Sequence, residues 1–291
     1  MEIFRALAVL AEPPGRAGAA RVAEALGLGE VPTAADYADV FVFRLYPYAS
    51  VYLGAEGMLG GEARERVAGF LTALGRAVPP EPDHLALMLG AYASLAEAEG
   101  AAGEGQRRES LRGARRAFLW EHLLSWLPVY LDKLEQVAPA FYRAWGRTLA
   151  AALDAEAEEL GRQDTLPLHL REAAALADPR ESSAEEFLKT LLAPARTGVI
   201  LLRDDIARAA RELGSGVRAG ERLFALRSLV GQDAAGALSR LASEADSWAA
   251  LHRRRRGAHG AVADWWAARA ASTAKLLREL SDDADKNLGT V

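Results

Sequence analysis

The side chains that could do chemistry in this sequence are few, and the best placed pair is Asp83-His84. A carboxylate beside an imidazole can bind a cation or exchange protons. The pair follows Glu81 and Pro82, so Asp83 is also well placed as the N-cap or first-turn acid of a following helix. The sequence leaves both interpretations open: a recognition pair, or a helix cap beside a partly buried histidine.

A third titratable group, His122, lies on an apolar stripe, where a histidine is more often part of the core. A metal-dependent hydrolase that uses Asp83, His84 and His122 is an alternative, but the two-histidine helix spacing that holds a metal is absent. No Gly-x-Ser-x-Gly elbow and no phosphate-binding loop occur, and the chain has no cysteine for thiolate or metal chemistry. The sequence therefore predicts no enzyme, no metal and no cofactor.

Aromatic residues are dense between Phe118 and Trp145. Such a cluster is usually core, and it is also typical of a groove that binds an apolar peptide. The spacing does not separate these two interpretations. The cluster consists of Phe118, Trp120, Trp126, Tyr130, Phe141, Tyr142 and Trp145.

The run Arg253 to Arg256 is the strongest local charge. Gly257 follows it directly, which favours a solvated helix end where cations complement the helix dipole. A contact with phosphate or with an acidic partner is the alternative.

The overall charge argues against a dedicated nucleic-acid binder, because 35 Lys and Arg residues face 40 Asp and Glu residues in a chain of 291. The longest stretch without a charged residue, His84 to Ala96, is shorter than the roughly 18 residues that a membrane span needs. The N-terminus lacks a basic region followed by an apolar core, so we expect no signal peptide. These features predict a cytoplasmic protein without stable membrane insertion.

The elements that must position these residues are helices, since Ala, Leu, Arg and Glu dominate between clusters of Gly and Pro. Thr33 and Asp36 form a capping-box pattern that opens a helix through Arg44. A helix over 62–74 ends at Gly75, and another spans 83–98. The chain is therefore predicted to be all-α.

The rest of the chain, from Phe118 onward, is also predicted to be helical. An apolar stripe from Phe118 to Leu134 is broken or kinked at Pro128, and a long helix then runs to Leu160. Residues 162–182 read as a linker, and Ser182 to Glu186 cap a helix over 184–193. Four further helical stretches follow, at about residues 203–213, 219–230, 234–255 and 261–281. We expect the helix end to fray from Ser281.

Four ordered motifs resemble one family. Glu81-Pro82-Asp83-His84 looks like the Glu-Pro-Asp-His signature of the TorD/DmsD/NarJ family of redox-enzyme maturation chaperones, and His122 to Pro128 resembles its His-Leu-x-Pro-Trp-x-Pro segment. Phe141-Tyr142 is similar to a later element, and Phe41 to Tyr52 to an early aromatic helix and turn. Ser125 departs from the pattern, where the family usually has proline.

The resemblance implies an all-helical TorD-like core over residues 1–181, followed by a C-terminal helical extension over 182–291. It implies a cytoplasmic chaperone that binds the twin-arginine leader or N-terminal tail of an apo molybdenum-enzyme catalytic subunit before export or assembly. It also implies homodimers, with a hinge for domain swapping in residues 100–105 or 162–182.

The resemblance also implies which residues bind the peptide. Asp83 and His84 are the expected recognition pair, and Glu81 and Pro82 shape their approach. The neighbouring wall is expected to be lined or supported by His122, Trp126 and Pro128. A helical scaffold or regulatory protein that binds a folded partner through the C-terminal helices and Arg253 to Arg256 is the alternative.

Overall fold

The computed structural model describes residues 2–15, 18–163, 165–216 and 220–288, and every regular element among them is a helix. The all-α prediction is therefore confirmed. By internal contacts the chain divides into two compact units. The first comprises Met1–Val51 and Leu59–Arg171, and the second Tyr52–Met58 and Glu172–Val291.

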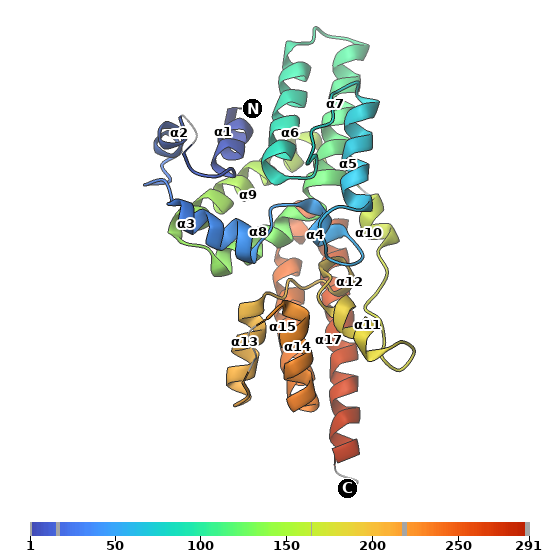
Figure 1. Cartoon of the computed structure of the whole chain (residues 1–291). Coiled ribbons are helices and arrows are strands. Elements are labelled where there is room, and N and C mark those ends of the chain that lie inside the picture. The colour runs from blue at the N-terminus through green and yellow to red at the C-terminus, as the bar shows by residue number, and fades with distance from the viewer. Residues whose placement is uncertain (1, 16–17, 164, 217–219, 289–291) are drawn as a thin grey trace. The chain divides into compact units, whose positions relative to one another are not determined.

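The first unit contains short helices near its start and longer ones later (Figure 1). Helices α3 and α7 each continue directly into a π-helical turn. Helix α6 packs against α1 and α7, and α8 packs against α9. The elements are α1 (Glu2–Leu10), α2 (Ala19–Ala25), α3 (Ala34–Tyr37), the π-helix η1 (Ala38–Arg44), α4 (Ala49–Leu53), α5 (Glu62–Ala73), α6 (Leu85–Ala101), α7 (Gln106–Phe118), the π-helix η2 (Leu119–Leu123), α8 (Leu127–Val137), α9 (Ala140–Leu160) and α10 (Leu168–Glu172). The last residues of α4 and α10, from Tyr52 and at Glu172, are assigned to the second unit.

Aromatic side chains form the core of the first unit. The ring of Phe41 meets that of Tyr142 edge-on, with centroids 4.8 Å apart. Trp145 is fully buried, and its indole N–H donates to the carbonyl oxygen of Leu7 at 3.0 Å. All seven residues of the predicted aromatic cluster are buried, so the cluster is core and not an open groove.

The second unit is built around the pair α15 and α17, which pack along each other. Between their faces the ring of His252 lies close to those of Trp248 and Trp266, at centroid distances of 5.4 and 5.9 Å. The Nε2–H group of His252 donates to the carbonyl oxygen of Gly198 at 2.9 Å. The elements are α11 (Ala184–Leu191), α12 (Pro194–Thr197), α13 (Arg203–Glu212), α14 (Arg222–Gln232), α15 (Ala234–Arg254), α16 (Arg256–His259) and α17 (Ala261–Leu288).

The short segment Tyr52–Met58 belongs to the second unit because it lies against the junction of α11 and α12. Gly57 has φ +62°, and a Cβ there would lie 3.1 Å from the carbonyl oxygen of Leu192 and 3.2 Å from Cα of Ala193. Only glycine fits such a close approach without strain. The domain boundary at residues 181 and 182 stays a prediction, since a compact unit is not a demonstrated folding domain.

Several expected boundaries are corrected. The helix predicted over 83–98 begins at Leu85 and ends at Ala101, and its N-cap is His84. The stretch 162–182 contains the short helix α10, and α17 continues beyond Ser281 to Leu288. The helix expected from residue 219 begins at Arg222, and residue 219 itself lies outside the described residues.

Candidate functional site

The turn Glu81 to His84 is held against residues 47–50 by backbone hydrogen bonds. The N–H of Leu85 donates to the carbonyl oxygen of Pro47 at 2.8 Å, and the N–H of Ala49 donates to that of Asp83 at 3.1 Å. These bonds form an isolated antiparallel bridge between Tyr48 and His84. The turn therefore has one fixed backbone path, although the two segments are far apart in sequence.

Asp83 caps a helix, but not the helix that the sequence indicates. Its Oδ2 accepts a hydrogen bond from the N–H of Ser50 at 3.1 Å, in the first turn of α4. The carboxylate thereby satisfies one of the N–H groups that a helix start leaves without an intrahelical partner. The residue is 2% exposed, so it supports the turn from inside.

His84 takes over the cap of α6. Its Nδ1 accepts a hydrogen bond from the N–H of Ala86 at 3.3 Å, so in the neutral ring the proton is assigned to Nε2. Burial lowers the pKa of His84, and the nearby charges of Glu81, Glu12 and Asp83 oppose that shift. The half-buried ring is therefore neutral near pH 7 and is surrounded by carboxylates.

Tyr48 joins Glu81 to His84. Its hydroxyl donates to Oε2 of Glu81 at 2.9 Å, and its ring meets that of His84 edge-on with centroids 4.9 Å apart. Burial and the bond to Glu81 both raise the pKa of Tyr48, so the hydroxyl keeps its proton. The sequence reading missed this residue. The sequence feature that points to the bridge at Tyr48 is the pair Pro47 and Pro82, because proline favours an extended backbone in both bridged segments.

The other expected site residues are inside the first unit. Pro82 is buried, and Pro128 is buried in the first turn of α8. Trp126 is fully buried, with its indole N–H donating to the carbonyl oxygen of His122 at 2.9 Å. Its ring meets that of Tyr130 edge-on at 5.3 Å. In this structure Pro82, Trp126 and Pro128 can support the wall of a peptide-binding surface from inside, but they are not exposed on it.

His122 lies in η2 and is 6% exposed. Its ring contacts those of Phe70 and Phe118, with centroids 5.1 and 5.2 Å away. Burial lowers its pKa to about 3, and the positive charges of His169 and Arg66 act in the same direction. Its Nδ1 has no hydrogen-bond partner among the described residues. The ring is thus a neutral core histidine. No group of three or more potential metal-ligating side chains occurs in the described part of the chain.

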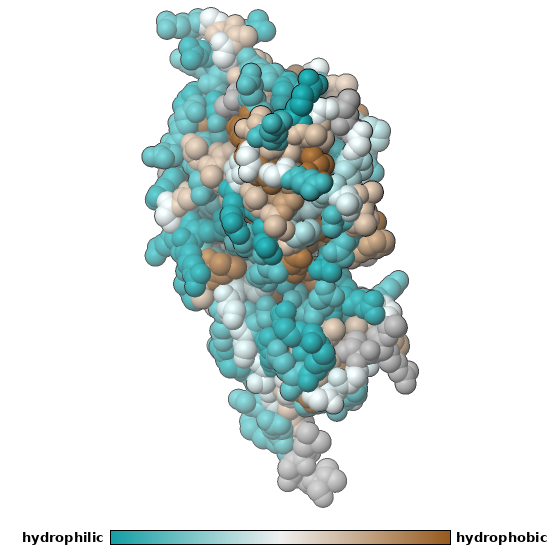
Figure 2. Space-filling view, turned by 90° about the vertical axis from the view of Figure 1, so that its left-hand side faces the viewer, coloured by the Kyte–Doolittle hydropathy of each residue, from teal (hydrophilic) through white to brown (hydrophobic). Residues whose placement is uncertain are grey.

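Exposed apolar side chains flank the turn along the chain. Val42 and Phe43 lie near the end of η1, Tyr46 precedes the bridge, and Leu87 lies in the first turn of α6. Phe43 is the most exposed of them, at 74%. Figure 2 shows hydrophobic residues in several separate patches on one face, with hydrophilic residues between them. Such exposed aromatic side chains are common in protein-binding surfaces.

The arginine run ends α15, as its solvated interpretation predicts. Arg253 and Arg254 are exposed in the last turn of that helix, and Arg256 forms an ion pair with Asp264 at 3.1 Å. Within the described ranges, no helix has both the length and the apolar content to cross a bilayer.

Comparison with known proteins matches the part of the chain that holds the turn. Residues 15–132 match the family described as nitrate reductase delta subunit. The chain is 34% identical over 112 residues to the chaperone protein TorD of Vibrio vulnificus (strain YJ016), covering 36% of this chain and 52% of that protein. It is 33% identical over 131 residues to the chaperone protein TorD of Vibrio cholerae serotype O1, covering 42% and 57%. No solved structure matches the chain at a significant level.

The chain thus spans about half the length of the curated relatives it matches. These relatives are named as chaperones. The family match includes Glu81 to His84 and His122 to Pro128, the two strongest motifs of the sequence resemblance. The segment 15–132 of this chain is thus similar to the family described as nitrate reductase delta subunit and to chaperone proteins named TorD.

Proposed function

We propose that the protein is a cytoplasmic maturation chaperone for a redox enzyme. Its client is the apo catalytic subunit of a molybdenum-cofactor oxidoreductase, which it binds through the twin-arginine leader or N-terminal tail before export or assembly. The observation that carries this proposal is the family match over residues 15–132, because it contains the turn Glu81 to His84 on an all-helical scaffold.

The turn has the chemistry that a basic, partly apolar leader needs. Glu81 is exposed, and His84 is neutral and half-buried beside it. A guanidinium group pairs well with a carboxylate, and the chain carries a net charge of −5, which favours the approach of a basic peptide. The exposed side chains of Phe43, Tyr46 and Leu87 offer contacts for the apolar core of the leader.

Co-purification from the native cytoplasm tests this function. The tagged full-length chain is expected to recover a molybdenum-enzyme catalytic subunit that still carries its leader, identified by mass spectrometry. The variant Glu81→Lys is expected to lose this client, because it reverses the exposed charge of the turn. Glu135→Lys is the matched control, since Glu135 is an exposed carboxylate on α8 that is paired with Arg147. Recovery of no redox-enzyme subunit by the wild type would contradict the proposal.

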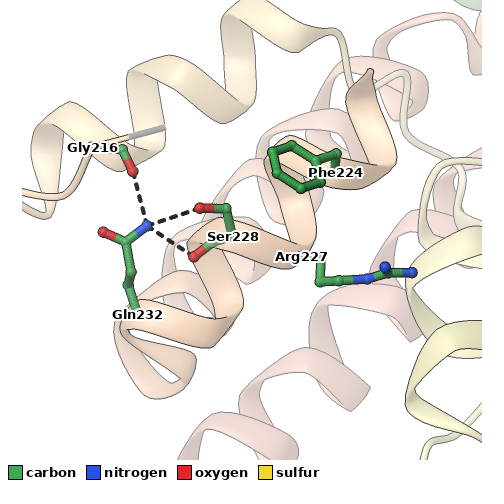
Figure 3. Close-up of a pocket in the computed structure, with 5 residues that line it drawn as sticks. All are labelled: Gly216, Phe224, Arg227, Ser228 and Gln232. Carbon is green, nitrogen blue, oxygen red and sulfur yellow. Dashed lines mark hydrogen bonds between the residues drawn. The ribbon is translucent and has the colours of Figure 1, made fainter. Parts of the chain in front are cut away.

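A second candidate function is a helical scaffold that binds a folded partner through the C-terminal helices. One observation favours it: the residues beyond the family match carry a shallow groove of about 350 Å³ beside α14 (Figure 3). Phe224 is 42% exposed there, and the amide N–H₂ group of Gln232 donates to the carbonyl oxygen of Gly216 at 2.8 Å.

The double variant Phe224→Ala and Arg227→Ala separates the two functions, because both residues line this groove. A scaffold would lose its partner in this variant. A leader-binding chaperone would keep its client, because the turn Glu81 to His84 is unchanged. Identification of the co-purifying chains distinguishes these outcomes.

A further inference from the structure

The hydroxyl of Tyr48 is the feature of the turn that neither the motif nor the proposed function uses. We propose that Tyr48 is a positioning residue that presents the carboxylate of Glu81 to an arginine side chain of the bound leader. This inference rests on the proposed function and names the group that recognises the cation. Its physical basis is the hydrogen bond from the Tyr48 hydroxyl to Oε2 of Glu81 at 2.9 Å.

Among the acidic residues of the turn, only Glu81 is exposed. Asp83 is 2% exposed, and its Oδ2 is used by the N–H of Ser50 at the start of α4. Replacing that bond with a ligand contact would leave a helix N–H unsatisfied. Asp83 therefore stabilises the backbone of the site, and Glu81 is the carboxylate that an incoming guanidinium can reach.

An exposed glutamate is mobile, and fixing its side chain when a ligand binds costs rotamer entropy. Tyr48 reduces this cost in advance because its own position is fixed. Its backbone bridges to His84, and its ring packs edge-on against the imidazole at 4.9 Å. The hydroxyl thus holds one oxygen of Glu81 and leaves the carboxylate oriented for a charge-assisted bond through the other.

The experiment measures the affinity of the full-length chain for two fluorescein-labelled peptides by anisotropy. One is a synthetic twin-arginine leader, and the other has both arginines replaced by glutamine. Glu81→Gln is expected to weaken binding of the arginine peptide about tenfold, since a hydrogen bond to a charged group is lost. It should change binding of the glutamine peptide little. Tyr48→Phe is expected to weaken binding of the arginine peptide about threefold, and it should leave the thermal unfolding midpoint of the protein unchanged.

The double variant Tyr48→Phe, Glu81→Gln distinguishes positioning from a general structural role. Because Tyr48 acts through Glu81, the double variant should bind no more weakly than Glu81→Gln alone. The salt dependence of binding should also fall to the same extent in the double variant and in Glu81→Gln, because both lack the same charge. The control Glu135→Gln removes an exposed carboxylate from α8 and should leave both affinities unchanged.

Additive losses in the double variant would overturn the inference, since Tyr48 would then act independently of Glu81. Unchanged arginine-peptide binding in both single variants would overturn it as well, while the chaperone function would stand. If the wild-type chain binds neither peptide, it is the proposed function that fails. These outcomes separate the two levels of the argument.

Discussion

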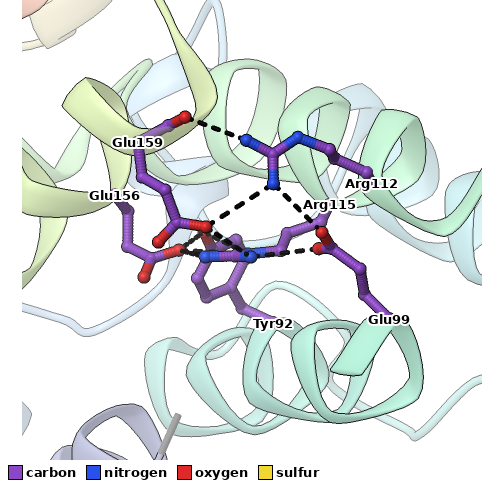
Figure 4. A network of polar contacts seen from close by, with 6 residues as sticks. All are labelled: Tyr92, Glu99, Arg112, Arg115, Glu156 and Glu159. Atoms are coloured by element: carbon purple, nitrogen blue, oxygen red, sulfur yellow. Dashed lines mark hydrogen bonds and ion pairs between the residues drawn. The ribbon is translucent and has the colours of Figure 1, made fainter. Parts of the chain in front are cut away.

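Replacement of Arg115 by methionine should destabilise the first unit more than any surface change, because Arg115 neutralises two buried carboxylates (Figure 4). Its Nη1 donates to Glu99 at 3.0 Å and its Nε donates to Glu156 at 3.1 Å, while Nη2 forms an ion pair with Glu156. Arg115 and Glu99 are each 4% exposed and Glu156 is 7% exposed. The hydroxyl of Tyr92 also donates to Glu156, so the network links α6, α7 and α9.

The size of the stability loss follows from the two buried carboxylates that the substitution leaves without a counter-charge. Burial alone would lower the pKa of Arg115, but its bonds to Glu156, Tyr92 and Glu99 outweigh this and raise the pKa, so the group stays charged. Methionine fills much of the volume but leaves Glu99 and Glu156 without their main counter-charge. Removing one partner of a buried ion pair costs about 3–5 kcal/mol. We expect a loss in that range at pH 7.

Urea unfolding followed by far-UV circular dichroism measures this loss. With a urea m-value of about 2–3 kcal/mol/M, the midpoint should fall by about 1–2 M. Arg147→Met is the control, because Arg147 pairs with Glu135 at 2.6 Å on the surface and its loss should leave the midpoint unchanged. Adding Glu99→Gln and Glu156→Gln to Arg115→Met should recover part of the loss. Equal midpoints for Arg115→Met and Arg147→Met would refute the argument.

Three further predictions concern single positions. Gly198→Ala should destabilise the second unit more than Gly214→Ala: both have positive φ, but only at Gly198 would a Cβ lie 2.5 Å from the backbone nitrogen of Ala270, as thermal unfolding of both variants can show. Asp83→Ala should cost about 1–2 kcal/mol in urea unfolding, and Asp83→Asn less, because asparagine keeps an acceptor for the cap of α4. Burial lowers the pKa of His252 to about 4, against about 6.5 in the unfolded chain, so stability should be lost as pH falls through that window. Between pH 7 and pH 5 His252 accounts for a loss of roughly 2 kcal/mol, so the total loss should be smaller by that amount in His252→Gln, which keeps a donor for Gly198.

The local signals of the sequence predicted local structure well. Thr33 and Asp36 form the capping box that their spacing indicates, with the N–H of Asp36 donating to the Thr33 hydroxyl at 3.2 Å. Gly75 and Gly161 follow the ends of α5 and α9 with positive φ, as helix-stop glycines do. These features depend on residues within one turn of each other, so the local sequence is sufficient to predict them.

The contacts of the candidate site depend on residues 33 positions apart, and no local pattern encodes them. Asp83 illustrates the limit. Its position before a helix predicted a cap for that helix, but the structure gives the cap of α6 to His84 and uses Asp83 at the start of α4. The π-helical turns η1 and η2 were not predicted either, because a helical sequence pattern does not distinguish a π-helical turn from an α-helical one.

The structure also changes how the family motif should be interpreted. Asp83, His122 and Trp126 are buried, whereas Glu81 is exposed and His84 is half-buried. A buried residue of a motif can abolish binding by distorting the scaffold, so loss of function at such a position does not identify a contact. A variant at Asp83 must therefore be compared with its unfolding midpoint before any binding defect is assigned to recognition. At Glu81 no such correction is needed, because an exposed carboxylate supports little of the fold, and a binding defect there reports the ligand directly.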